Sequence, residues 1–348
     1  MKKNFARLVG LAIVGVAVAA GAVLVAEAGP VAYKLTATFK VGGDGGWDYA
    51  TLSPDSHLLY VTRTTHTMAV DVATGKVVAD IGGQHRAHGV AIVPEARRGF
   101  ISDGGNGSVQ IFDLPTHSSI GSVAAAPDAD GIIYDHASNR VLVLCGRAHQ
   151  MVAIAPDVNP VGGQPAATVD LGGSPEFAVA DEKGKVYVNI ADQDEVAVVD
   201  TKAMKVVARW PTGPGRRPTG MSMDRGTRRL FVGCRNNRLV VMNADDGKIV
   251  ADFPIGAFVD ATAFRNGLAF ASCGDGTLTI IREVSADRFE LAQVAKTELG
   301  ARTMAIDPSG EMIYLPTADL TFPASSASGG RPRPVPVPGT FRILVVTQ

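Results

Sequence analysis

The chain has 348 residues, and its 33 Lys and Arg nearly balance its 34 Asp and Glu. Because charges of both signs are interspersed without long runs, the composition gives no reason to expect binding to nucleic acid or to an anionic membrane surface. Gly (39) and Pro (20) are frequent and aromatic residues are few, which suits many short strands joined by tight turns.

The first 28 residues have the pattern of a secretory signal peptide. Lys2, Lys3 and Arg7 precede an apolar stretch that ends in Ala26-Glu27-Ala28, a small-x-small cleavage site. Cleavage there leaves Gly29 as the new N-terminus, and we predict a periplasmic or extracellular protein. Roughly 20 apolar residues can also span a bilayer, so an uncleaved anchor stays open as an alternative. Beyond this segment we expect no membrane contact. No Cys follows the cleavage site, which excludes a lipoprotein.

A short apolar strand recurs along the rest of the chain. Each copy carries an aromatic residue or Leu at the same place: Tyr60, Phe100, Leu142, Tyr187, Phe231, Phe270 and Tyr314. The intervals are 40, 42, 45, 44, 39 and 44 residues, a period typical of propellers and solenoids. Turn residues divide each copy into four short strands, which bury both faces when several sheets stack around an axis.

The last copy of the repeat lacks one strand, and the N-terminal part of the chain has one extra strand. The seventh copy ends with "FRILVV" at 341–346 and lacks a fourth strand, whereas "YKLTATFKV" at 33–41 precedes the first copy. Pairing the two removes an open sheet edge. We therefore predict one all-β domain at 29–348, a seven-bladed β-propeller of four-stranded antiparallel blades in which the N-terminal strand completes the last blade.

One phrase of the repeat returns almost unchanged. "AVDVATGKVVADI" at 69–81 is matched by "VVMNADDGKIVADF" at 240–253, and we interpret both as outer hairpins with Gly75 and Gly247 at turn positions of positive φ. Residues 60–102 resemble the YVTN-type β-propeller repeat, with "YVTR" in place of YVTN. The resemblance implies an exported bacterial seven-bladed propeller. It leaves the function open, because the family and its relatives include envelope binding proteins, dehydrogenase subunits and lactonases.

Three cysteines occupy one position in three copies of the repeat, Cys145, Cys234 and Cys273. Equivalent points on neighbouring packed sheets are about 10 Å apart, whereas a disulfide needs Cα atoms within roughly 7 Å of each other. We predict three free, partly buried thiols. The segment "CGRAH" at 145–149 does not have the C-x-x-C-H spacing of haem attachment, so no haem is expected.

The loops between blades are the long and varied ones, and they share one face of a propeller. Their last residues lie where the central channel opens: Asp48, His88, Asp130, Glu176, Thr219, Asp260 and Arg302. Two interpretations stay open. These residues solvate the channel mouth, or they form a binding site in which carboxylates and His88 hold a divalent cation or a cationic or hydroxylated ligand. The candidate metal ligands are Asp48, His88 and Asp130.

Other residues of the same face have weaker signals. Arg216 and Arg217 lie opposite the acidic members of the ring, where they either bind an anionic ligand or are simply solvated. Four loop histidines, His66, His85, His88 and His149, offer a transition-metal site or are solvated loop residues. His85 and His88 form an H-x-x-H pair outside any helix, so the spacing does not aim both rings at one point.

A long insertion at 317–340 interrupts the last copy. Its first half is small and polar, and "RPRPVPVP" within it predicts an extended polyproline II segment. The insertion is a lid or docking arm, or a flexible loop without a function of its own.

No G-x-S-x-G or H-E-x-x-H motif is present in the sequence, and no catalytic residue is assigned. We favour a monomeric, non-catalytic binding or scaffold propeller in the periplasm or cell envelope, with a small molecule or an envelope protein as its partner. Two alternatives remain: a metal-assisted, lactonase-like hydrolase, and an accessory subunit that docks to a redox enzyme.

Overall fold

The structure, a computed structural model, describes residues 30–53, 57–323 and 334–348. Val31–Gln348 forms one compact unit. The predicted signal peptide, 1–28, lies outside the described residues. Among the residues that are described, we find no helix with the length and apolar character that crossing a membrane requires.

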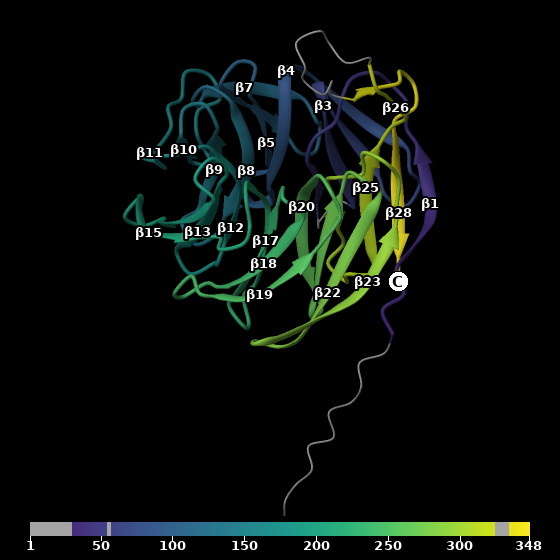
Figure 1. The fold of residues 1–348 in the computed structure, drawn as a ribbon. Coiled ribbons are helices and arrows are strands. Elements are labelled where there is room, and N and C mark those ends of the chain that lie inside the picture. The colour runs from purple at the N-terminus through teal and green to yellow at the C-terminus, as the bar shows by residue number, and fades with distance from the viewer. Residues whose placement is uncertain (1–29, 54–56, 324–333) are drawn as a thin grey trace, which may run out of the picture. The chain divides into compact units, whose positions relative to one another are not determined.

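The unit is an all-β propeller whose sheets stand around a common axis (Figure 1). Four sheets each consist of four antiparallel strands that follow one another along the chain. Their strands are β8(Ala129–Asp135), β9(Arg140–Cys145), β10(Gln150–Ile154) and β11(Ala167–Asp170); β12(Pro175–Ala180), β13(Lys185–Ile190), β14(Glu195–Asp200) and β15(Lys205–Pro211); β16(Pro218–Asp224), β17(Arg229–Cys234), β18(Arg238–Asn243) and β19(Ile249–Pro254); and β20(Val259–Arg265), β21(Leu268–Cys273), β22(Thr277–Ser285) and β23(Arg288–Lys296). The first strands of neighbouring sheets contact one another, which places them at the axis.

The prediction of seven four-stranded blades is wrong. Within residues 30–53, 57–323 and 334–348 the propeller has six sheets of four or more strands, because the first two copies of the repeat belong to one six-stranded sheet. Its strands are β2(Ala50–Ser53), β3(Leu58–Asp71), β4(Val77–Val93), β5(Arg98–Asp103), β6(Ser108–Asp113) and β7(Ser119–Ala124), with the short 3-10 helix Pro94–Ala96 between β4 and β5.

Backbone pairing explains why the two copies merge. His66, expected to lie in a loop, belongs to β3, and residues 82–89, expected to be an inter-blade loop, belong to β4. Thr64 pairs with Ala87, and Ala87 also pairs with Asp103 of β5. The two segments therefore continue the ladder from one copy into the next. An apolar cluster that includes Tyr60, Ile101 and Phe112 packs inside this sheet.

The last sheet joins the two ends of the unit. It has the order β1(Lys34–Lys40), β28(Arg342–Thr347), β25(Met312–Thr317) and β24(Ala305–Ile306). The register of β1 and β28 runs antiparallel from Lys34 with Thr347 to Lys40 with Arg342. Figure 1 shows the purple β1 beside the yellow β28. The N-terminal strand thus takes the place that the incomplete last copy leaves open.

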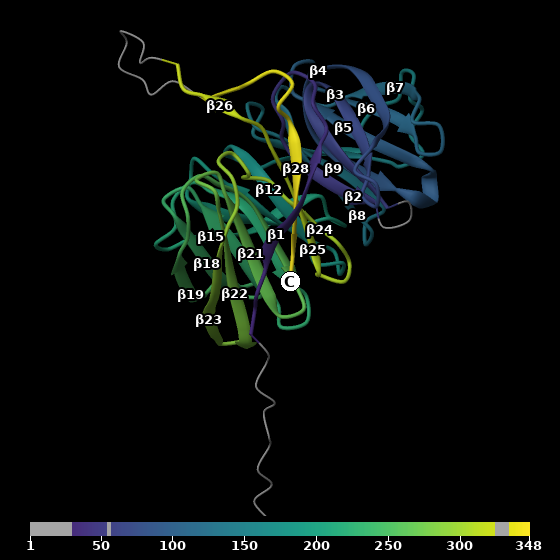
Figure 2. The same ribbon diagram turned by 90° about the vertical axis from the view of Figure 1, so that its right-hand side faces the viewer.

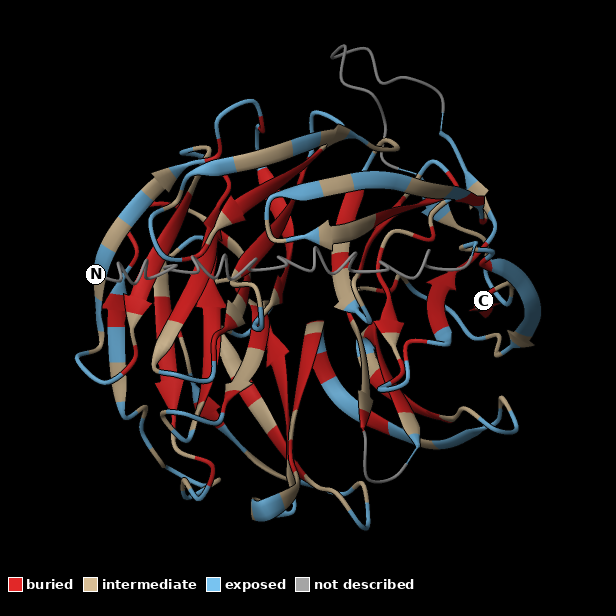
Figure 3. Ribbon diagram, turned by 90° about the horizontal axis from the view of Figure 1, so that it is seen from below, coloured by how far each residue is buried: buried red, intermediate tan, exposed pale blue. Residues whose placement is uncertain are grey.

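The core lies between the faces of neighbouring sheets. Six aromatic landmarks of the repeat, Tyr60, Phe100, Tyr187, Phe231, Phe270 and Tyr314, are at most 1% exposed, and burying such a side chain contributes about 1.5–3 kcal/mol. The view in Figure 3 shows buried strands inside the unit and exposed stretches on the outer strands. This is why the middle strands are uninterrupted apolar runs while outer strands such as β15 alternate.

The three cysteines are free, as predicted, but they are fully buried rather than partly buried. Burial raises the pKa of the Cys145 thiol to about 11 and those of Cys234 and Cys273 to about 12. Because the nucleophile is the thiolate, these thiols are inert at neutral pH. They serve the packing of the core.

The outer hairpins contain the predicted glycine turns. Gly75 has φ +68° and Gly247 has φ +73°. A Cβ on Gly75 would lie 2.5 Å from the Phe39 ring, and one on Gly247 would lie 2.2 Å from the Trp210 ring. Both glycines are therefore needed for the turn and for an aromatic ring that packs on it.

The insertion of the last copy is described at its two ends. There β26(Leu320–Thr321) pairs with β27(Val335–Pro336) in a two-stranded sheet, so Val335 and Pro336 of the predicted polyproline segment are paired. Residues 324–333 lie outside the described residues. Figure 2 shows β26 extending beyond the sheets of the propeller.

Candidate functional site

The residues predicted to ring the axis are fixed by a repeated hydrogen bond. A hydroxyl or amide group two residues after the aromatic landmark donates to the backbone carbonyl of a ring residue that starts the next copy. Thr62 Oγ1 donates to His88 O at 2.7 Å, Ser272 Oγ to Arg302 O at 2.6 Å and Asn189 Nδ2 to Thr219 O at 2.8 Å. Ser102 donates to Asp130 O in the same way, and Thr303 Oγ1 donates to Asp48 O at 2.9 Å. Side chains of the middle strands thus position the site.

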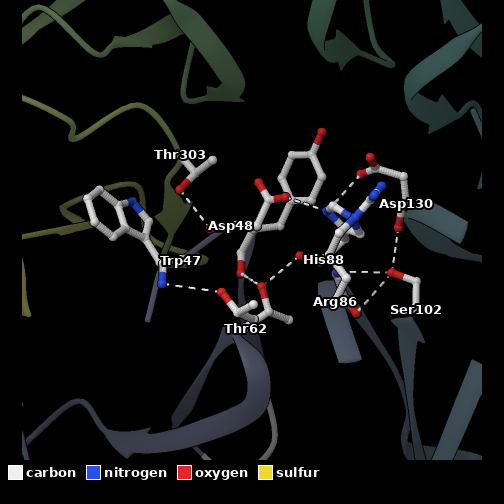
Figure 4. A network of polar contacts seen from close by, with 12 residues as sticks. Trp47, Asp48, Thr62, Arg86, His88, Ser102, Asp130 and Thr303 are labelled. Atoms are coloured by element: carbon white, nitrogen blue, oxygen red, sulfur yellow. Dashed lines mark hydrogen bonds and ion pairs between the residues drawn. The ribbon is translucent and has the colours of Figure 1, made fainter. Parts of the chain in front are cut away.

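Asp48, His88 and Asp130 converge at the axis, although they come from three separate segments of the chain. Nδ1 of His88 lies 2.6 Å from Oδ2 of Asp48 and 3.6 Å from Oδ1 of Asp130, and one possible ligand atom of each residue lies within 4.8 Å of the others. Figure 4 shows the His88 ring between the two carboxylates. The structure therefore brings together the three residues that the sequence proposes as metal ligands.

Arg86 determines the protonation of the His88 ring. Its Nε donates to His88 Nε2 at 2.8 Å, so the neutral ring carries its proton on Nδ1 and donates it to Asp48. Arg86 also pairs with Asp128. Burial lowers the pKa of His88, but the hydrogen bond to Asp48 and the charge of Asp130 outweigh burial, and the pKa is raised above its ordinary value.

Asp260 and Arg302 form the opposite side of the cluster. Oδ1 of Asp260 receives Arg235 Nη2 at 2.6 Å, and Oδ2 receives Arg302 Nε at 2.8 Å. Arg302 also donates to Trp47 O at 3.0 Å and lies 3.8 Å from Asp48. The charge of Asp260 is therefore matched by two guanidinium groups.

Asp130 and Glu176 have fewer positively charged partners than Asp260. Within the described part of the chain neither has a guanidinium or ammonium group at ion-pair distance. Burial, followed by the charges of Asp48, Glu176 and Asp260, raises the pKa of Asp130 to about 7 against the effect of His88. Burial and the charge of Asp260 raise the pKa of Glu176, while Arg235 and Arg217 oppose the shift.

Tyr49, which immediately follows Asp48, completes the cluster. Its side chain is 9% exposed, its ring centroid lies 5.1 Å from that of Phe177, and its backbone N donates to His88 O at 3.0 Å. Burial raises the pKa of Tyr49 well above its ordinary value, and so do the charges of four carboxylates, Asp130, Asp260, Asp48 and Glu176. The phenol thus lies within the electrostatic reach of every carboxylate of the ring.

The remaining predicted residues lie apart from this cluster to different degrees. Thr219 is buried, and its hydroxyl donates to the backbone of Gly233 and Val259. Arg216 Nη1 donates to two carbonyls of its own loop, at 2.6 and 2.8 Å. Arg217 influences Glu176. No described contact joins the side chain of Arg216 or Arg217 to a carboxylate of the ring.

The other predicted histidines do not join His88. His85 Nδ1 lies 2.9 Å from Asn106 Nδ2 and 3.6 Å from Asp103, and His66 Nε2 lies 4.0 Å from Asp80. His149 is exposed. Each ring has different neighbours, so the H-x-x-H pair does not converge on one point.

Arg63, the residue that makes the motif YVTR rather than YVTN, holds the loop that precedes Asp48. Its guanidinium group is fully buried and donates to the carbonyls of Gly42, Asp44, Gly45 and Gly46 at 2.8–3.3 Å. The guanidinium carbon also lies 3.7 Å from the centroid of the Phe341 ring. Burial lowers the pKa of Arg63 to about 10. The loop is therefore fixed from inside the protein.

A surface hollow of about 500 Å³ lies away from the ring, between the loop after β23 and the β26 hairpin. Three of its charged residues pair with one another, since Arg342 contacts both Glu298 and Asp319. The unmatched carboxylates lie at the axis instead. We therefore place the candidate binding site at the axis.

Sequence reasoning identified the ring but missed four residues that control it: Tyr49, Arg63, Arg86 and Arg235. The signal for Tyr49 was its position directly after Asp48 at the start of an innermost strand. Arg86 lies in the part of β4 that was expected to be a loop, and Arg235 lies in the turn after β17, where no periodicity points to a partner.

No protein-family model matches the chain, and no curated protein is similar to it in sequence. Three solved structures show the scale of the structural similarity. The WD40 repeats of RRP9 superpose with a TM-score of 0.72 at 9% identity, covering 90% of this chain and 97% of that chain. A Mitotic Checkpoint Complex chain gives 0.71 at 11% identity, covering 90% and 92%. Kuenenia stuttgartiensis hydrazine synthase gives 0.66 at 13% identity, covering 78% and 92%. At these identities the likeness shows the β-propeller fold alone.

Proposed function

We propose that this protein is an exported, non-catalytic binding propeller that holds its ligand or partner with the side chains around the axis. The observation that carries the proposal is the convergence of Asp48, His88 and Asp130 with Tyr49 and Glu176 from separate strands. The similar solved structures include chains that belong to complexes by their titles, which supports a binding role. The repeat pattern supports membership of the YVTN-type family, and the leader at 1–28 supports export.

The chemistry of the nearby nucleophiles supports a role without catalysis. The hydroxyls of Thr62, Ser102 and Thr303, which contact the backbone of ring residues, donate to carbonyl oxygens. None of them has a general base as its acceptor, so none is activated for attack. The thiols are buried and protonated. The polar groups of the site are thus arranged for contact rather than for bond making.

The proposal is tested by native mass spectrometry of tagged protein recovered from the exported fraction of its own host. We expect a polypeptide beginning at Gly29 that carries a bound small molecule or a second protein. The double variant Asp130→Asn/Glu176→Gln should lose that species, whereas Glu95→Gln, which changes an exposed carboxylate, should keep it. Recovery of the same species with both variants would place binding elsewhere.

The carboxylate and histidine cluster favours a second candidate, a metal-assisted hydrolase. Asp48, His88 and Asp130 provide two oxygen donors and one nitrogen donor within 4.8 Å of one another, and a bound cation could activate water there. Metal analysis combined with a lactone hydrolysis assay tests this candidate. It requires activity that is lost in both Asp48→Asn and Asp130→Asn.

A further inference from the structure

The acidic side of the ring has negative charge that the described residues do not balance. Asp260 is paired with Arg235 and Arg302, and Asp48 receives His88. Asp130 has a single ion-pair contact in the described segments, to His88 at 3.6 Å, and Glu176 has none there. The two lie on neighbouring innermost strands, β8 and β12, which contact each other. Both carboxylates are partly buried, and withdrawing such groups from water costs free energy unless a cation joins them.

Tyr49 supplies an independent observation. More than nine-tenths of its side chain is buried, yet its hydroxyl has no hydrogen-bond partner in residues 30–53, 57–323 and 334–348. The Tyr49 ring packs on Phe177, the residue after Glu176 on β12, with 5.1 Å between the ring centroids. The charges of Asp130 and Glu176 contribute to the raised pKa of this phenol. The hydroxyl, like the two carboxylates, therefore has hydrogen-bonding capacity that no described residue uses.

The protonation of His88 distinguishes between a metal ion and an organic cation. A metal bound at Nδ1 needs the lone pair of that atom, and the ring proton must then move to Nε2. Nε2 already accepts the Nε–H of Arg86 at 2.8 Å. A metal would therefore have to displace Arg86 as well as the hydrogen bond to Asp48. An organic cation needs neither change, because it leaves His88 as it is.

An ammonium group matches what the site offers. It has three N–H donors and no acceptor, so it can donate to Asp130, Glu176 and the oxygen of Tyr49 together. The aromatic face of Tyr49 also attracts a positive charge. We propose that this side of the ring binds the primary ammonium group of a small organic amine, in contact with Asp130, Glu176 and Tyr49. This inference rests on the proposed binding function and names the ligand class for the same site.

The test is a calorimetric titration of the purified protein at pH 8 with n-butylammonium chloride. The neutral isostere 1-butanol and CaCl₂ are titrated in parallel. We expect n-butylammonium to bind and 1-butanol to give no heat of binding. Glu176→Gln and Asp130→Asn should each weaken ammonium binding about tenfold or more, and Tyr49→Phe should weaken it several-fold. Glu95→Gln serves as the matched control and should bind like the parent.

Three results would overturn the inference: equal binding of 1-butanol, unchanged binding by Glu176→Gln and Tyr49→Phe, or saturable binding of CaCl₂ in place of the ammonium. Circular dichroism of every variant separates misfolding from loss of the site. If n-butylammonium does not bind while Asp130→Asn/Glu176→Gln still loses the species captured from the exported fraction, the ligand class is wrong and the proposed function stands. If neither experiment depends on these residues, the proposed function falls too.

Discussion

Ionisable side chains in this propeller differ in whether a partner of opposite charge lies beside them. Asp260 has two guanidinium partners. Glu283, on the long strand β22, has both carboxylate oxygens buried, with no hydrogen-bond partner in the described part of the chain. Burial is the main reason that the pKa of Glu283 is raised, and the charge of Asp224 adds to it, while Thr227 and the charge of Arg229 oppose the rise. Such a group opposes folding whenever it is ionised.

Glu283→Gln should therefore stabilise the protein at neutral pH. The cost of the ionised carboxyl is absent below the unfolded-state pKa, grows as the pH rises toward the higher folded-state pKa and is complete above it. We expect the free energy of unfolding to rise by about 1 kcal/mol at pH 7, the lower end of the cost of an unsatisfied buried group, with little gain at pH 4. Urea unfolding at both pH values measures this. Equal gains at the two pH values would contradict the charge argument.

Arg86→Met should raise the pKa of His88 further. The substitution removes a positive charge and frees Nε2 to take a proton, while Asp48 and Asp130 still stabilise the imidazolium. The chemical shift of the His88 ring proton followed against pH reports the change. Arg147→Met is the control, because Arg147 lies 3.8 Å from Asp128 and has no contact with His88 among the described ion pairs. A lower pKa in Arg86→Met would mean that the assigned tautomer is wrong.

At the scale of strands, the hydroxyls of the middle strands link each sheet to the next. Ser102 has two roles, since its Oγ accepts from Gly89 N at 3.0 Å and donates to Asp130 O. Thr62 and Ser272 make the same kind of bond to His88 and Arg302. The backbone of His88, Asp130, Thr219 and Arg302 is therefore held by the preceding copy of the repeat.

Ser102→Ala should leave one buried donor and one buried acceptor without partners. The expected loss is about 1–3 kcal/mol of unfolding free energy, together with weaker ligand binding because the backbone of Asp130 is released. Chemical denaturation gives the first quantity and calorimetry with n-butylammonium the second. Ser118→Ala, at an exposed position of an outer turn, should change neither. A similar loss of unfolding free energy in both variants would show that the effect does not come from the hydrogen bonds of Ser102.

Gly75→Ala tests the outer hairpin. An L-residue at φ +68° costs about 1–2 kcal/mol, and the new Cβ would lie 2.5 Å from the Phe39 ring. We expect a loss of at least about 1 kcal/mol by thermal unfolding. Gly82→Ala is the matched control, since a Cβ there has no atom within 4 Å and should shift stability by less than about 0.5 kcal/mol. Equal losses of stability in the two variants would mean that the positive φ of Gly75 and its contact with Phe39 do not require glycine.

At the scale of the whole molecule, closure depends on the pairing of β1 with β28. Deleting residues 31–41 removes six residue pairs, so at roughly 0.5 kcal/mol per hydrogen bond we expect to lose at least about 3 kcal/mol. The comparison is with a chain that begins at Val31, by thermal and urea unfolding. Undiminished stability of the shorter chain would mean that the ring closes without this strand.

The sequence predicts the features that follow from the period of the repeat. The spacing of landmarks such as Tyr60 and Phe270 predicts a propeller fold. The missing strand of the last copy predicts how the ring closes. The residues at which innermost strands start predict the site at Asp48, His88 and Asp130. The number of sheets was predicted wrongly because the pairing of Thr64 with Ala87 joins two copies of the repeat, and periodicity contains no information on such a contact.

The partners within the site could not be predicted for a related reason. Arg86 contacts Asp128 from an irregular part of β4, and Arg235 contacts Asp260 from the turn after β17. The geometry of both arginines depends on the folded backbone rather than on sequence spacing. In the sequence, Arg63 is a charged residue at the end of a predicted strand, where its side chain is expected to be exposed to solvent. Instead, four loop carbonyls surround it, and carbonyl positions are set by the conformation of the Gly-rich loop.

The register of β1 with β28 has a consequence for biosynthesis. Lys34–Lys40 leaves the ribosome among the first strands, and Arg342–Thr347 is the last strand to be made. A nascent chain therefore cannot complete the circle before Arg342–Thr347 has been synthesised. Any product truncated before this strand keeps β1 and β25 as exposed sheet edges.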